Sequence, residues 1–192
     1  SKVGDVRYRD ANGDGVINDS DRTLMGKPDP DYTFGITNTF KYKNFDLSFL
    51  ITAQTGGQIY SVLGRAMDRP GMGANGNVLS HWKNMWKSEE EPGDGKTPGI
   101  DNANTGQFYD SRWLYSTDFI KLKNVTLGYR IPFKKKFIQN ARVYLTGENL
   151  LMWDKYEGGF SPEANNGGST GDYDYGSYPQ ARVITLGVNV TF

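Results

Sequence analysis

Apolar and polar residues alternate in several segments of this 192-residue chain. Between residues 32 and 42, aromatic and aliphatic side chains occupy even positions, whereas threonine and glycine occupy most odd positions. Between residues 45 and 54, the apolar side chains occupy the odd positions. Because successive side chains of a strand point to opposite faces, each segment is predicted to be a β-strand with one apolar face. The short turn 41–44 makes the two strands a hairpin.

Three later segments continue the pattern. Residues 119–132, 141–150 and 181–192 are each predicted to form a strand. In the first of them, the apolar positions change from even to odd numbers at Asn124, which indicates a β-bulge or the point where the strand leaves a membrane. The last segment has a uniform apolar face, made by Ile184, Leu186, Val188, Val190 and Phe192. The fold class is therefore predicted to be all-β, with five antiparallel strands.

The connections between the predicted strands alternate in length. The long ones are residues 1–31, 55–117 and 154–179, and the short ones are 41–44 and 132–140. Transmembrane β-barrels of bacteria show this asymmetry, with long extracellular loops and short periplasmic turns. The pattern therefore favours strands of such a barrel, with Phe192 at the periplasmic rim. An aromatic girdle is expected at the same rim, formed by Phe40, Tyr42, Phe45, Tyr129 and Phe133.

A soluble sheet is the alternative interpretation of the strands, because a sheet with one buried face shows the same alternation. Five strands cannot close a large barrel, so further strands would have to come from outside residues 1–192. With both edge strands unpaired, the isolated chain is expected not to fold. Within the long segment 55–117, the stretch SHWKNMWKSEE (80–90) is predicted to form a short helix.

The composition excludes several functional classes. The 22 basic and 22 acidic residues cancel, so no overall charge would attract nucleic acid, and no nucleic-acid partner is expected. Cysteine is absent, which excludes disulfides, thiolate zinc sites and cysteine nucleophiles. The single histidine, His81, is expected to be a loop residue beside Trp82. No apolar run approaches the ~20 residues of a membrane-spanning helix.

Charged residues give no sign of an enzyme. No spacing of carboxylates selects a catalytic pair, so no catalytic residue and no enzymatic activity are predicted. The two charge runs, residues 89–91 and 134–136, are expected to be solvated loop segments. The first residues, SKVGDVRYRDANGDG, contain no initiator methionine and do not look like a secretion signal. They are therefore expected to be mid-chain sequence, with any export signal upstream.

The segment DANGDGVINDSD, residues 10–21, follows the spacing of a twelve-residue calcium loop. Side-chain oxygens stand at positions one, three, five and nine, a backbone carbonyl would serve at position seven, and Gly15 stands at the sharp turn. The predicted calcium ligands are Asp10, Asn12, Asp14, Val16, Asn18 and Asp21. Position twelve is Asp21 instead of the glutamate of EF-hands, as in dockerin-like loops. A bound ion would be structural; the alternative is a turn whose side chains bond only its own backbone.

Four stretches of the chain, taken in order, resemble the C-terminal region of the SusC/RagA family of TonB-dependent outer-membrane transporters. They are YRDANGDGVINDSDRTLMGKPDPDYTFGITNTFKYKNFDLSF, DFIKLKNVTLGYRIP, ARVYLTGENLLMWDKYEGGFSPE and YPQARVITLGVNVTF. Together they span nearly the whole chain and end on Phe192. The resemblance identifies residues 1–192 as a C-terminal part of the receptor barrel, with the plug domain and the N-terminal strands outside the chain.

The resemblance also implies a complete barrel of about 22 strands, closed by an N-terminal plug. Import would be driven by TonB, acting through the part outside this chain, and a SusD-like lipoprotein would cover the barrel. The cargo would be an oligosaccharide, or alternatively a peptide, crossing the outer membrane of a Bacteroidetes-type bacterium. Phe192 would act as the signal read by the barrel assembly machinery, or as a lipid-facing rim aromatic.

Aromatic residues are frequent in and beside the predicted loops: Trp82, Trp86, Trp113, Trp153, Tyr156, Tyr173, Tyr175 and Tyr178. Such rings stack on sugars, contact partner proteins or pack within their own loops, and the sequence selects none of these roles. The predicted function is therefore TonB-dependent nutrient import, with outer-membrane lipid around the strands. The alternative function is that of a soluble, secreted β-domain that binds calcium and carbohydrate.

Overall fold

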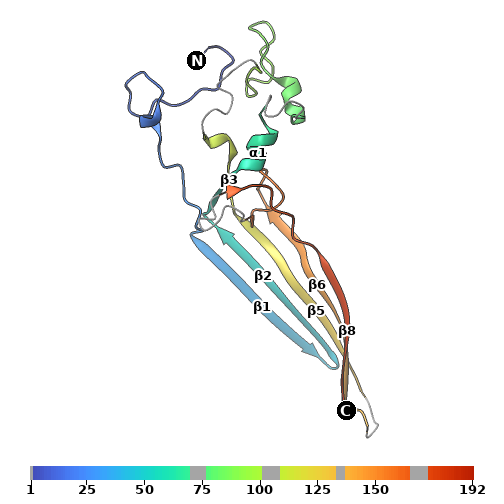
Figure 1. The fold of residues 1–192 in the computed structure, drawn as a ribbon. Helices are drawn as coiled ribbons and strands as arrows, with labels where there is room; N and C mark the ends of the chain where they lie inside the picture. The colour runs from blue at the N-terminus through green and yellow to red at the C-terminus, as the bar shows by residue number, and fades with distance from the viewer. Residues whose placement is uncertain (1, 70–76, 101–108, 133–136, 165–172) are drawn as a thin grey trace.

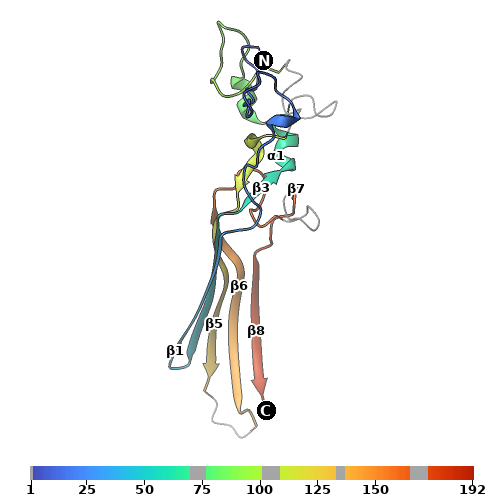
Figure 2. The same cartoon turned by 90° about the vertical axis from the view of Figure 1, so that its left-hand side faces the viewer.

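The computed structural model describes residues 2–69, 77–100, 109–132, 137–164 and 173–192. Its main element is an elongated sheet of five long strands, with a smaller group of short elements at one end (Figure 1). We call this group the head; it comprises all the short strands and helices outside the long sheet, with the segments that join them. The long connections meet in the head and the short ones lie at the opposite end, where the C-terminus is also found (Figures 1 and 2).

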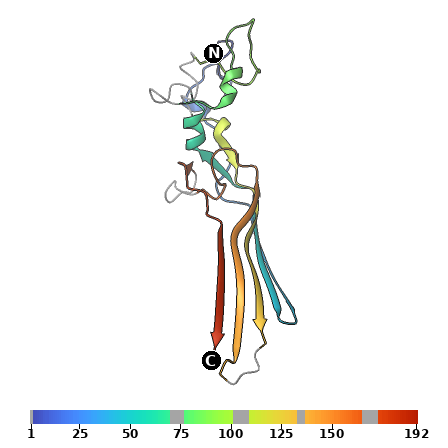
Figure 3. The same cartoon turned by 90° about the vertical axis from the view of Figure 1, so that its right-hand side faces the viewer.

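All neighbouring strands of the long sheet are antiparallel. In spatial order they are β1 (Tyr32–Tyr42), β2 (Phe45–Thr55), β5 (Phe119–Ile131), β6 (Asn140–Asp154) and β8 (Val183–Thr191). They follow one another across the sheet in chain order, which is the up-and-down arrangement of transmembrane barrels. The open, curved sheet is visible in Figure 3. The five predicted strands are thus confirmed, and β6 continues past the predicted end at residue 150.

A β-bulge lies in the middle of β5. Between Leu122 and Asn124 the register shifts against both neighbouring strands, which places Lys123 at the bulge. On the β6 side, Asn149 has a φ of 53°, a left-handed conformation that asparagine adopts more easily than most residues. The change of phase at Asn124 is therefore a bulge, the first of the two alternatives considered for the sequence.

The register places apolar side chains of all five strands on one face. One row across the sheet consists of Phe40, Leu47, Leu127, Leu145 and Leu186, and the next of Tyr42, Phe45, Tyr129, Val143 and Val188. Leu127 and Leu145 are each 47% exposed, although both lie on interior strands. No element within the described ranges covers this face (Figure 3). A continuous uncovered apolar face of this kind is typical of a sheet that faces lipid.

The predicted aromatic girdle lies at the end of the sheet with the short turns. Tyr42, Phe45 and Tyr129 are cross-strand neighbours there, and the ring centroids of Phe45 and Tyr129 are 4.7 Å apart. Phe192 follows β8 at the same end and is 79% exposed. Phe40, another predicted member, lies one row further from the turn, opposite Leu47. Phe133, the fifth predicted member of this rim, lies outside the described residues.

The opposite face of the sheet is polar. One row contains only hydroxyl side chains, those of Thr39, Ser48, Thr126, Thr146 and Thr185. The hydroxyl oxygens of Thr126 and Thr146 are 2.9 Å apart and share a hydrogen bond. The sheet therefore has one apolar and one hydrogen-bonding face, as expected for strands that lie between lipid and a polar barrel interior.

A glycine on the polar face lets an ion pair span three strands. Arg142 of β6 crosses over Gly128 of β5 and donates two hydrogen bonds to the carboxylate of Asp46 on β2, one of them at 2.9 Å. A Cβ at position 128 would collide with the guanidinium group of Arg142. Charged bidentate pairs of this geometry are among the stronger polar contacts, so β2 and β6 are linked directly across β5.

The head contains the remaining elements. They are η1 (Asp19–Asp21), β3 (Gln58–Ser61), α1 (Val62–Met67), η2 (Ser80–Asn84), η3 (Ser111–Trp113), β4 (Leu114–Ser116) and β7 (Tyr173–Asp174). Strand β3 lies between β4, which is antiparallel to it, and β7, which is parallel to it. Among the described residues, none of the helices has the length and apolar character that crossing a membrane requires.

The long connection 55–117 contains more regular structure than the one short helix predicted in it, because it supplies most of the head's short strands and helices. The helix expected over residues 80–90 is limited to the 3-10 helix η2, which ends at Asn84. The backbone N–H of Trp86 donates to the carbonyl of Thr97 at 3.0 Å, so a tertiary hydrogen bond replaces the helical one.

We expect Gly128→Ala to destabilise the complete protein by about 1–3 kcal/mol, because the added methyl group displaces Arg142 from Asp46. The matched control is Gly35→Ala on the polar face of β1, where an added Cβ meets no atom within 4 Å. The control should change stability by no more than about 0.5 kcal/mol. Thermal unfolding of the purified protein in detergent measures both, and equal effects would contradict this role of Gly128.

Candidate functional site in the head

Two fully buried polar side chains join the small sheet of the head to the segment after β6. The carboxylate of Asp174 on β7 accepts a hydrogen bond from the Tyr156 hydroxyl at 2.5 Å and two more from backbone N–H groups that follow it. Burial, and secondly this hydrogen bond, raise the pKa of the Tyr156 hydroxyl, so the phenol stays protonated. Ser61 caps the first turn of α1 and donates its hydroxyl to the carbonyl of Gly158.

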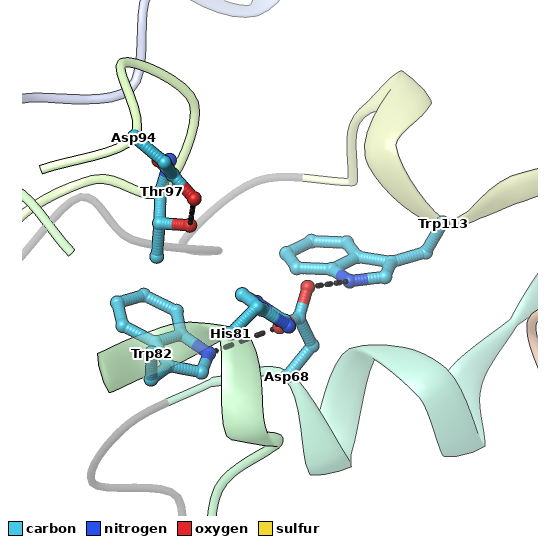
Figure 4. A network of polar contacts seen from close by, with 6 residues as sticks. All are labelled: Asp68, His81, Trp82, Asp94, Thr97 and Trp113. Atoms are coloured by element: carbon cyan, nitrogen blue, oxygen red, sulfur yellow. Dashed lines mark hydrogen bonds and ion pairs between the residues drawn. The ribbon is translucent and has the colours of Figure 1, made fainter. Parts of the chain in front are cut away.

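The carboxylate of Asp68 contacts two indoles and an imidazole (Figure 4). Asp68, the residue after α1, accepts a hydrogen bond from Trp82 Nε1 at 3.0 Å and another from Trp113 Nε1 at 3.1 Å. His81 Nε2 lies 2.8 Å from the same carboxylate. Trp113 and Trp82 are 1% and 5% exposed, so their N–H groups have little access to water. Asp68 therefore fixes η2 and η3 against α1. His81 lies beside Trp82, as predicted, but it belongs to the 3-10 helix η2 and not to a loop.

A second carboxylate closes the turn after η2. Asp94 accepts hydrogen bonds from the backbone N–H groups of Lys96 and Thr97, at 2.8 and 2.7 Å, and from the Thr97 hydroxyl at 2.8 Å. These donors lower the pKa of Asp94 to about 2, with the Thr97 backbone N–H as the largest cause. The turn is drawn beside the Asp68 cluster in Figure 4. Because the carboxylate stays charged well below neutral pH, the turn keeps its hydrogen bonds across the physiological range.

Buried and charged contacts also join the head to the long sheet. Lys121 of β5 is 3% exposed, and its Nζ lies 2.6 Å from Glu163 Oε2 and also donates to the side chain of Gln180. Asp118 accepts a hydrogen bond from the Gly56 backbone N–H at 2.7 Å, next to the end of β2. A buried lysine is stable only when it is paired in this way, so these contacts hold the head in place over β5.

The predicted calcium loop is closed by its own side chains. Asp10 accepts from the backbone N–H groups of Gly13 and Gly15 at 2.6 and 2.8 Å. Asp21 accepts from those of Ala11 and Asn18 at 2.9 and 2.8 Å. The N–H of Asn18, and then that of Ala11, lower the pKa of Asp21. The first and twelfth positions of the loop therefore organise its backbone.

The chemistry of the proposed ligand atoms suits calcium, because every one of them is an oxygen. Within the described ranges, however, no three acidic or histidine side chains gather closely enough to hold a metal ion. The oxygens of Asn12 and Asp14 accept from the backbone, and the Val16 carbonyl accepts from the Asn18 amide at 3.3 Å. These hydrogen bonds are those of a turn whose side chains bond its own backbone, and calcium binding stays a prediction.

The eight loop aromatics fall into different environments. Trp82, Trp113 and Tyr156 are buried in the head. Tyr156 packs against Ile59 and Tyr115 of another segment, so its contacts are not limited to its own loop. Trp86 lies against the backbone of Gly4. The exposed ones are Trp153, Tyr175 and Tyr178, the last of them 96% exposed. Tyr173 belongs to β7 and is half-buried.

Sequence reasoning missed Ser61, Asp68 and Asp174, which hold the head together. For Ser61 a local signal exists, because serine is a preferred N-cap residue. For Asp68 no local signal exists: its indole partners are 14 and 45 residues away in the chain. Such distant pairs do not appear in any periodic pattern.

The comparisons with known proteins give the same picture along the whole chain. No family model matches it. The chain is 37% identical, over 99% of its length, to the TonB-dependent receptor P26 of Formosa agariphila. Over 100% of its length it is 33% identical to the TonB-dependent receptor P3 of the same species. Over 96% of its length it is 27% identical to the TonB-dependent receptor SusC of Bacteroides thetaiotaomicron. The chain spans 20%, 19% and 17% of these relatives, respectively.

Solved structures agree with the fold. A chain of the RagAB peptide importer in its open-open state superposes with a TM-score of 0.74 and 24% identity, over 92% of this chain and 19% of that one. A chain of the RagAB peptide transporter superposes with a TM-score of 0.68 and 25% identity, over 88% of this chain and 18% of that one. The predicted all-β fold with antiparallel barrel strands is confirmed, while the number of strands in a complete barrel stays a prediction.

We expect Asp68→Ala to loosen the head without dissolving the long sheet. Two buried indole N–H groups lose their acceptor, at a cost of about 1–3 kcal/mol each. Hydrogen exchange measured by mass spectrometry on the complete protein should therefore accelerate in peptides covering η2 and α1, and remain unchanged in β5. Asp68→Asn, which keeps one acceptor oxygen, should give an intermediate effect.

The control for this substitution is Glu89→Ala, which removes an exposed carboxylate close to η2 in the chain. It should leave the exchange rates of both peptides unchanged. Unaltered exchange in Asp68→Ala would show that the two indoles are held by other contacts.

Proposed function

We propose, from the premise that this chain belongs to the SusC/RagA family of TonB-dependent receptors, that it forms part of the wall and head of an outer-membrane importer. The similarity over the whole chain to three receptors carries the proposal. The complete protein would take up nutrients with energy from TonB, acting through the part that lies outside residues 1–192. It would be a transporter and not an enzyme, in keeping with the names of its relatives.

The different character of the two faces of the long sheet supports a barrel wall that lies in a membrane. The apolar rows that contain Leu127 and Leu145 would contact lipid, and the aromatic row at the short turns would lie at the membrane interface. The hydroxyl row and the ion pair of Asp46 and Arg142 would face the polar barrel interior. Strands β1 and β8 would pair with strands supplied from outside the chain, because each has a free edge in the described sheet.

The head would lie outside the cell, because long loops occupy the extracellular side of bacterial barrels. A SusD-like lipoprotein would contact this side, and the cargo would be an oligosaccharide, with a peptide as the alternative. The similarity of the fold to chains of the RagAB peptide importer and the RagAB peptide transporter supports a role in import. Phe192 would serve the barrel assembly machinery as its C-terminal aromatic signal.

The experiment that tests this function combines fractionation with growth. In cells that express the complete receptor, we expect a heat-modifiable band in the outer membrane, and growth on an oligosaccharide or peptide mixture that depends on the receptor and on TonB. Leu127→Arg places a charge in the lipid-facing row and should cost up to about 2–4 kcal/mol, lowering the amount of folded receptor. Leu127→Phe keeps the position apolar and should assemble normally.

Two outcomes would contradict the proposal. A soluble, secreted product would favour the calcium- and carbohydrate-binding β-domain instead. Equal amounts of folded receptor in Leu127→Arg and Leu127→Phe would show that this face does not contact lipid.

The loop of residues 10–21 would bind calcium as a structural ion in the same head. A calcium ion at 100 times its dissociation constant stabilises the bound form by about 2.7 kcal/mol. Trypsin cleavage after Arg9 and Arg22, which flank the loop, should therefore be slower on the order of tenfold or more in calcium than in EGTA. Asp14→Ala removes a proposed ligand and should abolish this difference, whereas Asp29→Ala, an exposed aspartate beyond the loop, should keep it. Identical cleavage rates in calcium and in EGTA would show that residues 10–21 form a turn that needs no ion.

A further inference from the structure

The turn between β1 and β2 contains a lysine in an unfavourable backbone conformation. Lys43 has a φ of 52°, in the left-handed region where most side chains crowd the backbone. Glycine adopts this conformation without strain, and asparagine, which stands at the next position as Asn44, adopts it more easily than lysine. A strained residue of this kind is often explained by function. The conformation of the turn alone therefore does not account for a lysine at this position.

The ammonium group of Lys43 lies beside the apolar face of the sheet. Its Nζ is 5.3 Å from the ring centroid of Tyr42, within the range of a cation–π contact. Tyr42 is 71% exposed, and its cross-strand neighbour Phe45 is 52% exposed. Asp46, the acidic residue nearest in the chain, is paired with Arg142, and within the described ranges no carboxylate pairs with Lys43. The turn therefore offers a cation to an external anion, next to exposed aromatic rings.

The length of β1 places Lys43 at the level of lipid headgroups. The strand has 11 residues and begins and ends with a tyrosine of the apolar face, Tyr32 and Tyr42. At ~3.4 Å per residue and a tilt of ~40°, these two residues are roughly 26 Å apart along the membrane normal. This distance agrees with the apolar band of about 25 Å in bacterial barrels. Because Lys43 follows Tyr42 directly, it lies just beyond the hydrocarbon, where the phosphate groups of a bilayer are found.

We propose that this turn binds the headgroup phosphate of an anionic phospholipid in the leaflet next to the periplasm. The Lys43 ammonium would donate hydrogen bonds to the phosphate oxygens, and the rings of Tyr42 and Phe45 would contact the acyl chains. A phospholipid supplies the anion and the apolar contact together, which a soluble anion does not. A zwitterionic headgroup binds less well, because its own cation competes with Lys43 for the phosphate. The inference rests on the membrane position in the proposed function and goes beyond it by assigning a lipid site to one turn.

Three substitutions of Lys43 separate lipid binding from a structural role of the side chain. Lys43→Gln removes the charge, and Lys43→Arg keeps it. Lys43→Gly removes the side chain and relieves the strain of the positive φ, so the thermal midpoint of the receptor in a neutral detergent should equal or exceed that of the wild type. The matched control is Lys96→Gln, which removes the charge of an exposed lysine in the head.

Lipid preference is measured on the complete receptor in phosphatidylcholine nanodiscs by fluorine NMR, with trifluoromethylphenylalanine in place of Phe45 as the reporter. The probes, added in small amounts, are phosphatidylglycerol and phosphatidylcholine that carry a spin label close to the headgroup. Phosphatidylglycerol should broaden the wild-type signal about two- to fivefold more than phosphatidylcholine, up to the gain expected from one lysine near anionic lipid. Lys43→Arg and Lys96→Gln should keep this difference, whereas Lys43→Gln and Lys43→Gly should remove most of it.

The same broadening ratio in Lys43→Gln and in the wild type would overturn the proposal. A lower thermal midpoint of Lys43→Gly would also count against it, because the lysine would then stabilise the turn itself. The experiment separates this failure from failure of the proposed function. Equal broadening by both lipids in the wild type would refute only the headgroup site, whereas no broadening by either lipid would refute the lipid contact of the sheet and, with it, the barrel wall.

Discussion

The apolar face of the long sheet is the constraint on which the rest of this structure depends. Fully burying one leucine side chain contributes about 1.5–3 kcal/mol, so a face that crosses five strands requires an apolar surrounding over its whole area. The bulge at Lys123 serves this requirement. If the same sequence formed a regular strand with no bulge, Ile120 and Leu122 would point to the opposite face from Leu127, and the apolar surface would break in the middle of β5.

The contacts that stabilise the polar face differ from those that stabilise the head. On the polar face, small residues such as Gly128 leave room for long side chains of the neighbouring strands, and the contacts run across the sheet. In the head, short segments have too few apolar residues for a large core, and single carboxylates gather several donors instead. Asp68 and Asp174 each receive hydrogen bonds from elements that are far apart in the sequence. Such groups are stable when buried only because their acceptor capacity is used.

The local and periodic parts of the structure could be predicted from the sequence. Strand periodicity and connection length predicted all five long strands, and a bulge near Asn124 was one of the two alternatives for the change of phase in β5. The head was predicted less well: the expected helix 80–90 ends at Asn84, because a hydrogen bond from Trp86 to Thr97 competes with it. The buried hydrogen bond between Tyr156 and Asp174 was not predicted either, since it joins residues that are 18 positions apart in the chain.

The shared carboxylate of Asp68 limits how the loops of this head can be recombined. Its two oxygens receive indoles from η2 and from η3, so each loop contributes half of one anchoring point. A graft that replaced the η2 loop alone, with no indole at the place of Trp82, would remove the indole hydrogen bond from one oxygen of Asp68. The other oxygen would still accept a hydrogen bond from Trp113. The two loops therefore depend on each other structurally, and an engineered receptor with a new head would need both loops from the same parent protein.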